Sequence, residues 1–160
     1  MMDKLLKLLE NNARLRDDEL ALMLDMPAQE IARKICEYES NGTIKGYKTI
    51  FDHDKIADEK VTAFIEIKVQ PKLGMGFDDI ATRIAQLDEV ESLYLMSGGF
   101  DLAVMITGKT FTEVAMFVAK RLSPLDSVVS TATHFMLKRY KDAGVMVDSS
   151  VLDDRRKISL

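Results

Sequence analysis

The chain has 160 residues, so it can form one domain or two small ones, and its 47% hydrophobic and 30% charged residues favour a soluble protein with a buried core. A net charge of −4 argues against an indiscriminate nucleic-acid coat, although a local basic face is compatible with it. No apolar run approaches the roughly 18 residues that cross a bilayer, and the first residues lack a signal-peptide pattern, so we expect a cytoplasmic protein with no membrane partner.

Residues that commonly carry metal or catalytic chemistry are sparse. Cys36 is the single cysteine and cannot form an internal disulfide, and with only His53 and His134 elsewhere it cannot anchor a Cys/His metal cluster. No Ser/His/Asp arrangement, paired-carboxylate motif or phosphate-binding loop stands out. We therefore expect no metal site, no catalytic residues and no cofactor.

Residues 1–50 show the periodicity of helices. Leucines at helical spacing predict a first helix over residues 3–12. A second short helix is expected around Leu20, after a pair of aspartates. A third helix begins near Pro27, whose fixed φ suits a first helical turn, and ends at Gly42. Three short helices joined by tight links predict a compact trihelical unit.

The third helix has two distinct faces. Its buried stripe is formed by residues at helical spacing: Ile31, Ile35 and Tyr38. Gln29, Arg33 and Cys36 point the opposite way, and Lys34 is a further candidate DNA contact. On an isolated helix such side chains are ordinary solvated residues. After two other helices they predict a helix-turn-helix whose amide and guanidinium groups read base edges in a major groove.

Residues 43–51 alternate and are rich in β-formers, which predicts a small hairpin, or wing, attached to the three helices. Lys45 and Lys48 would then lie beside the DNA backbone. Contacts of this kind contribute affinity but carry no sequence information.

The second half of the chain has a different pattern, rich in candidate strands. Its expected segments follow in chain order: a polar linker at 51–60, a strand at 61–69, a helix at 77–87, two strands at 92–96 and 102–107, a helix at 111–122, a strand at 128–140 and a tail at 143–160. Residues 61–142 thus predict a ferredoxin-like βαββαβ domain, in which both helices cover one face of the sheet. Because the other face needs cover, we expect a twofold-symmetric dimer.

A glycine-built turn joins the two central strands, with the sequence Ser97-Gly98-Gly99-Phe100-Asp101. One interpretation is a tight hairpin. The alternative is that a bare backbone next to a hydroxyl and a carboxylate binds a small zwitterion. Backbone N–H groups would then receive its carboxylate, and Asp101 would pair with its ammonium group.

Three parts of the chain resemble the Lrp/AsnC family of regulators: the helix exit "NGTIKGYKTIFD", the turn at 97–101, and the strand at 129–137 with Thr131 and Thr133. The resemblance covers roughly residues 3–141. It implies an α+β fold, with a winged helix-turn-helix over 1–50 and a ferredoxin-like effector-binding and oligomerisation domain over 61–142.

The same resemblance implies a nucleoid-associated transcription regulator that binds double-stranded DNA and senses an amino acid or a related metabolite. It also implies a homodimer that assembles further, as a tetramer or octamer of dimers. The effector residues that it implies are Ser97, Gly98, Gly99, Asp101, Thr131 and Thr133. Simple β-propensity is an equally good explanation of the two threonines.

Some positions depart from the family pattern. Pro27 stands where a helix-capping serine is usual, and Cys36 and Glu37 stand where basic residues are common. Residues 27–50 carry four basic and three acidic side chains, so the reading face is only weakly positive. Two alternatives follow: a metabolite sensor of the same fold with weak or relaxed DNA binding, or an enzyme similar to siroheme decarboxylases. Such an enzyme would require clusters of histidine and arginine, which the glycine turn does not supply.

Overall fold

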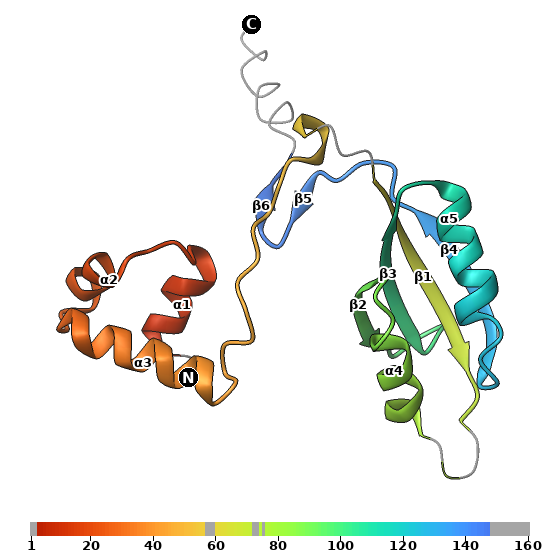
Figure 1. The fold of residues 1–160 in the computed structure, drawn as a ribbon, viewed down its shortest axis with the longest axis horizontal. Helices are drawn as coiled ribbons and strands as arrows, with labels where there is room; N and C mark the ends of the chain where they lie inside the picture. Colours follow the sequence, from red (N-terminus) through yellow and green to blue (C-terminus); the bar gives the residue numbers. More distant parts are fainter. Residues whose placement is uncertain (1–2, 57–59, 72–73, 75, 148–160) are drawn as a thin grey trace, which may run out of the picture. The chain divides into compact units, whose positions relative to one another are not determined.

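The computed structural model describes residues 3–56, 60–71, 74 and 76–147. The chain divides into two compact units, residues 1–50 and residues 51–160. Figure 1 shows the first unit as helices and the second as a sheet with helices packed along one side.

The first unit contains α1 (Lys4–Asn11), α2 (Asp17–Leu24) and α3 (Ala28–Ser40). Its core is made of apolar residues from all three helices: Leu5, Leu9, Leu20 and Ile31. The Asp3 carboxylate accepts a hydrogen bond of 3.0 Å from the Leu5 backbone N–H and so caps α1. The link between α2 and α3 turns at Asp25, which has a φ of 52°. The predicted helix-turn-helix is confirmed.

The hairpin expected at 43–51 is not formed: residues 43–51 contain no strand in the structure. The chain leaves α3 at Gly42, whose φ of +75° ends the helix, and the Ile44 backbone N–H then bonds to the Tyr38 carbonyl. No backbone hydrogen bond joins two halves of this segment among the described residues. Alternating β-formers fit an extended chain equally well when no second strand pairs with them.

The second unit contains a four-stranded antiparallel sheet in the order β2-β3-β1-β4. Its elements are β1 (Val61–Val69), α4 (Phe77–Ala85), β2 (Val90–Leu95), β3 (Leu102–Gly108), α5 (Phe111–Phe117) with a π-helical turn η2 (Val118–Leu122), and β4 (Val128–Phe135). This is the predicted βαββαβ arrangement. A short 3-10 helix, η1 (His53–Lys55), lies within the expected linker.

One face of the sheet is buried under α4 and α5. Alternate residues of β1 point to this face and have no more than 8% of their surface exposed: Ala63, Ile65, Ile67 and Val69. They share a core with Ile80 and Ile84 of α4 and with Val114 of α5. The intervening β1 residues point to the opposite face, which no described helix of the same unit covers (Figure 1).

The last part of the chain differs from expectation in two ways. The strand predicted over 128–140 ends at Phe135. The next residue, Met136, donates its N–H to the carbonyl of Thr62, which is the second residue of β1. Beyond this point β1 has almost no residues left to pair with β4. β5 (Lys141–Asp142), at the end of the predicted domain, pairs with β6 (Val145–Met146), within the predicted tail, as a two-stranded hairpin. Residues 148–160 of that tail lie outside the described residues.

Candidate functional site

The exposed stripe of α3 carries Gln29, Arg33, Cys36 and Glu37. An Arg33 guanidinium nitrogen lies 3.7 Å from the Glu37 carboxylate, one helical turn further on. Both side chains are more than half exposed, and such pairs contribute only about 0.3–0.5 kcal/mol. The Arg33 side chain is therefore held loosely and can exchange Glu37 for another acceptor.

Lys34 lies on a different side of α3 from Arg33. Its Nζ atom is 4.0 Å from the Asp3 carboxylate, which also accepts a hydrogen bond of 2.6 Å from the Tyr38 hydroxyl. The bond from Tyr38, then the bond from the Leu5 N–H and the charge of Lys34, lower the pKa of Asp3. Lys34 thus helps to hold α1 against α3, and its ammonium group is turned away from the exposed stripe.

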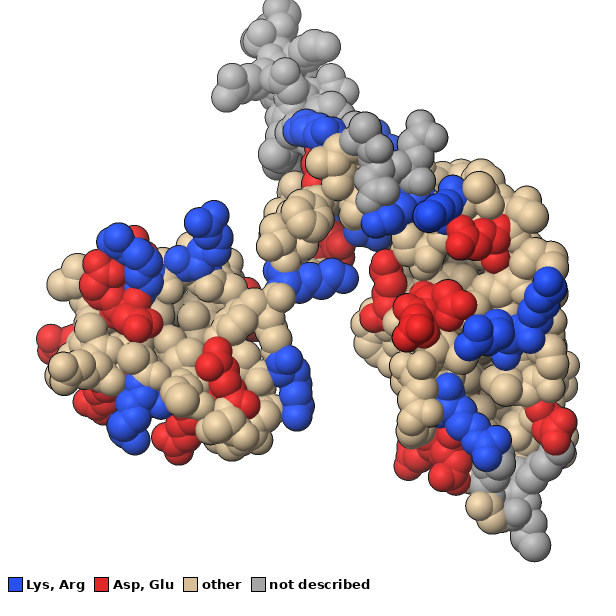
Figure 2. All heavy atoms as spheres, in the orientation of Figure 1, with Lys and Arg blue, Asp and Glu red and all other residues tan. Residues whose placement is uncertain are grey.

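Lys45 and Lys48 are both exposed. The Lys45 Nζ atom lies above Gly42, where a Cβ atom would come within 2.6 Å of it, so its charge sits at the C-terminal end of α3. Residues 1–50 contain eight Lys and Arg against nine Asp and Glu. Figure 2 shows the two kinds of charge mixed over this unit in the view drawn, so its basic groups are scattered on that face.

The glycine turn between β2 and β3 is held by Asp101. The Asp101 carbonyl accepts from the Met96 N–H at 2.8 Å, and the Asp101 N–H donates to the Ile67 carbonyl at 3.0 Å. Its carboxylate oxygen Oδ2 accepts from the Val69 N–H at 2.8 Å, next to a register irregularity in the pairing of β1 with β4. Asp101 therefore ties the turn to the end of β1, and its second oxygen, Oδ1, forms no hydrogen bond with the described chain.

The backbone of the turn is open to solvent. A Cβ atom added at Gly98 or at Gly99 would meet no other atom within 4 Å. Gly98 has a φ of +155°, which disfavours other residues, whereas Gly99 has no positive φ. Within the described residues the backbone N–H groups of Gly98, Gly99 and Phe100 donate to no acceptor. Three free donors at an uncovered turn can receive an anionic group.

Thr131 and Thr133 share a face of β4, as expected from strand alternation. They lie opposite Ile67 and Ile65 of β1, so they point to the helix-covered side and are half-buried. Because β1 separates β4 from β3, about two strand spacings, or roughly 10 Å, lie between these threonines and the start of β3. One subunit alone does not bring the threonines and the glycine turn together.

The uncovered face of the sheet carries an aromatic group. The Phe64 ring lies 6.0 Å from Phe100 and 6.1 Å from His134, measured between ring centroids. The His134 Nε2 atom is 3.4 Å from the Glu66 carboxylate. Tyr94 of β2 has 57% of its surface exposed and shares this face through its partner Ala103. The face is therefore partly apolar and carries exposed aromatic surface.

In the part of the chain that the structure describes, no group of three or more His, Cys, Asp or Glu side chains could hold a metal ion. None of the helices described there is long and apolar enough to cross a membrane.

Two interactions at the candidate sites were not predicted from the sequence. The hydrogen bond between Asp101 and Val69 joins residues 32 positions apart, and no local sequence pattern predicts it. The Arg33–Glu37 pair could have been found from its i, i+4 spacing, which places opposite charges on one helical face.

A protein-family model described as the Lrp/AsnC ligand binding domain matches residues 62–146. Among curated proteins, the HTH-type transcriptional regulator YugG of Bacillus subtilis is 44% identical over 156 residues, which are 97% of this chain and 93% of that protein. A proline dehydrogenase transcriptional activator of Rhodobacter capsulatus is 24% identical and is matched over 79% of this chain and 82% of its own length.

Solved structures with a similar fold include a transcriptional regulator of Neisseria meningitidis in complex with L-methionine, with a TM-score of 0.70 and 22% identity over 89% of this chain and 94% of that one. A feast or famine regulatory protein of M. tuberculosis, also in complex with L-methionine, has a TM-score of 0.69 and 19% identity over 90% and 95% of the two chains. AsnC of E. coli has a TM-score of 0.65 and 20% identity over 87% and 94%.

Proposed function

Because the chain belongs to the Lrp/AsnC family, we propose that it is a sequence-specific DNA-binding transcription regulator whose sheet-containing unit senses an amino acid. Residues 1–50 form the DNA-binding domain and residues 61–142 the effector-binding and oligomerisation domain. The observation that carries the proposal is the pairing of a helix-turn-helix with an uncovered turn of free backbone donors.

On DNA, the exposed stripe of α3 faces the major groove. Gln29 and Arg33 contact base edges, and Arg33 leaves Glu37 to do so, because the pair is weak and exposed. Lys45 and Lys48 contact phosphates and add affinity to every sequence. Lys34, which faces Asp3, acts mainly by fixing α3 in place.

In the effector site, the carboxylate of an amino acid binds the free N–H groups at Gly98 and Gly99, with the Ser97 hydroxyl beside them. The Asp101 oxygen that is not bonded to Val69 pairs with the ammonium group. Thr131 and Thr133 complete the site from a neighbouring subunit, since one subunit alone separates them from the turn. The L-methionine in two structural neighbours supports this class of effector.

The uncovered sheet face with Phe64 and Tyr94 is the surface through which two copies form a homodimer, and dimers assemble into tetramers or octamers of dimers. Acting on chromosomal DNA places the protein in the cytoplasm, at the nucleoid. It has no catalytic role and needs no metal or cofactor in this account.

Two substitutions test the DNA-binding part of the proposal. Arg33→Ala removes a base contact, so it relaxes base preference at one half-site position and weakens specific binding by roughly 1–3 kcal/mol. Lys48→Ala removes a phosphate contact, so it weakens all sequences alike and lowers the salt dependence by about one counterion. Selection from a random duplex pool, followed by salt titrations, measures both effects.

Binding that is insensitive to both substitutions would contradict the assignment of this face. Failure of the wild-type chain to select any sequence would favour the alternative of a sensor with relaxed DNA binding.

A further inference from the structure

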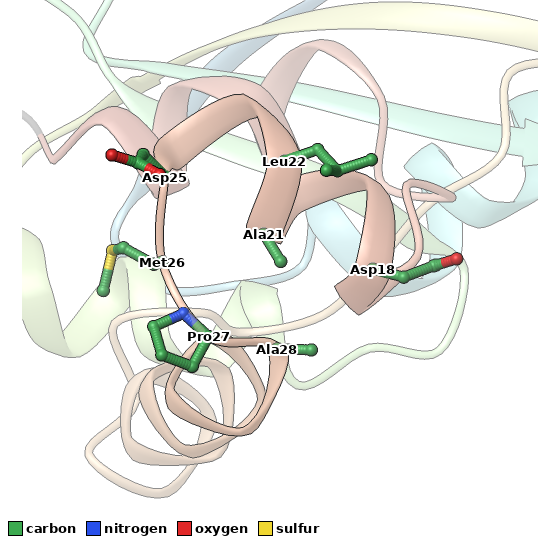
Figure 3. Close-up of a pocket in the computed structure, with 7 residues that line it drawn as sticks. All are labelled: Asp18, Ala21, Leu22, Asp25, Met26, Pro27 and Ala28. Atoms are coloured by element: carbon green, nitrogen blue, oxygen red, sulfur yellow. The ribbon is translucent and has the colours of Figure 1, made fainter.

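A shallow hollow of about 600 Å³ lies between α2 and the start of α3 (Figure 3). Small residues line it, with two larger apolar side chains and two carboxylates around them: Ala21, Pro27, Ala28, Leu22, Met26, Asp18 and Asp25. Figure 3 shows Asp18 and Asp25 coming from opposite ends of α2, and Ala21 pointing into the space between α2 and α3.

Two apolar side chains of α2 at or next to the hollow are largely exposed. Leu22 has 87% of its surface exposed, and the neighbouring Met23 has 58%. The core of the unit already contains Leu20 of the same helix, so neither residue is needed there. When a partner covers an exposed leucine, apolar surface is removed from water, and this favours the complex.

The charge around the hollow decides what kind of partner fits. From Arg16 to Asp25 the chain carries four carboxylates and one cation. Arg16 forms ion pairs with Asp18 at 3.0 Å and with Glu19 at 3.8 Å. Asp25, in contrast, forms no ion pair or side-chain hydrogen bond within the described chain. This surface therefore repels DNA phosphates, and two copies of it repel each other.

We propose that the hollow between α2 and α3 is a docking site for a basic, amphipathic segment of another protein that shares the DNA with this regulator. The segment places an apolar side chain against Leu22 and Met26 and a lysine or arginine at Asp25. Proteins that bind DNA carry such cationic segments, because phosphate contacts require them. The site lies at the link between the two helices of the helix-turn-helix, beside the helix that we propose enters the major groove.

The test uses the full chain and a short helical peptide with leucines on one face and lysines elsewhere. A matched peptide has glutamates in place of the lysines. The lysine peptide should bind and the glutamate peptide should not, with the lysine peptide's amide-resonance changes centred on α2 and the start of α3. Leu22→Ser should weaken binding about tenfold, and Asp25→Asn about threefold.

Asp78→Asn is the control, because Asp78, like Asp25, is an exposed carboxylate near an exposed apolar side chain, here Phe77, although it lies in the first turn of α4 and Asp25 follows the end of α2. It should leave peptide binding unchanged, and all three variants should bind DNA like the wild type, so the docking site can fail while the DNA-binding function holds. Equal binding by Leu22→Ser and the wild type would overturn the proposal. Resonance changes spread over all acidic surfaces, or changes at Leu22 and Asp25 caused by DNA alone, would also overturn it.

Discussion

At the residue scale, Asp101 holds the turn and has a second, proposed role in binding the effector, and one substitution series distinguishes the two. Its Oδ2 atom accepts the Val69 N–H, and its other oxygen faces the proposed ammonium group. Asp101→Ala leaves the Val69 donor without a partner, so it should lower the free energy of unfolding by about 1–3 kcal/mol and also abolish effector binding. Asp101→Asn keeps an acceptor oxygen, so it should fold almost like the wild type and lose only the charge partner.

Thermal unfolding and calorimetry with the amino acid that binds the wild type most tightly measure the two effects. If the asparagine variant binds that amino acid as well as the wild type does, Asp101 serves the turn alone. If alanine and asparagine are equally stable, the bond to Val69 contributes nothing.

The faces of individual residues follow from sequence wherever one element decides them. The stripe of Ile31 on α3 and the shared face of Thr131 and Thr133 are consequences of helical and strand periods. The surroundings of Asp101 and Lys34 depend on chain segments about 30 residues away, and no period encodes such contacts. The candidate site was therefore predictable as a set of residue types and not as an arrangement.

At the scale of elements, the helices and the order of strands along the chain were predictable, because apolar residues recur in them at helical or strand spacing. The segment at 43–51 was not, because its alternation is compatible with a strand that has no partner. The end of β4 was also missed, since it is set by where β1 begins and not by residues 136–140 themselves.

Gly46 tests whether the segment after α3 lacks a hairpin turn. In the structure Gly46 has no positive φ, and an added Cβ atom would meet nothing within 4 Å. Gly46→Ala should therefore leave the free energy of unfolding unchanged or raise it by up to about 1 kcal/mol, through loss of freedom in the unfolded chain.

Gly42→Ala is the control, because Gly42 has a φ of +75° and lies under the Lys45 ammonium group. This variant should be destabilised by about 1 kcal/mol or more. Denaturant unfolding of both variants gives the comparison. Equal destabilisation by the two substitutions would mean that Gly46 occupies a tight hairpin turn after all.

At the scale of the whole molecule, a helical unit with almost no net charge is joined to a unit that we propose senses an effector. Residues 1–50 carry one more acidic than basic side chain, so a single copy should make few phosphate contacts and bind DNA weakly. Pairing of subunits through the uncovered sheet face would then supply the affinity, because two linked reading helices bind half-sites together. An effector that binds between subunits can change that pairing and hence DNA binding.

The affinity of the full chain for its selected duplex, measured with and without each of the twenty amino acids, tests this claim most directly. At least one amino acid should change the affinity by about 5- to 150-fold, the usual range for coupled sites. Gly99→Leu should lose that change and keep DNA binding, since its side chain fills the open approach to the turn without straining the backbone. An identical affinity with all twenty amino acids, or an undiminished response in Gly99→Leu, would contradict the account.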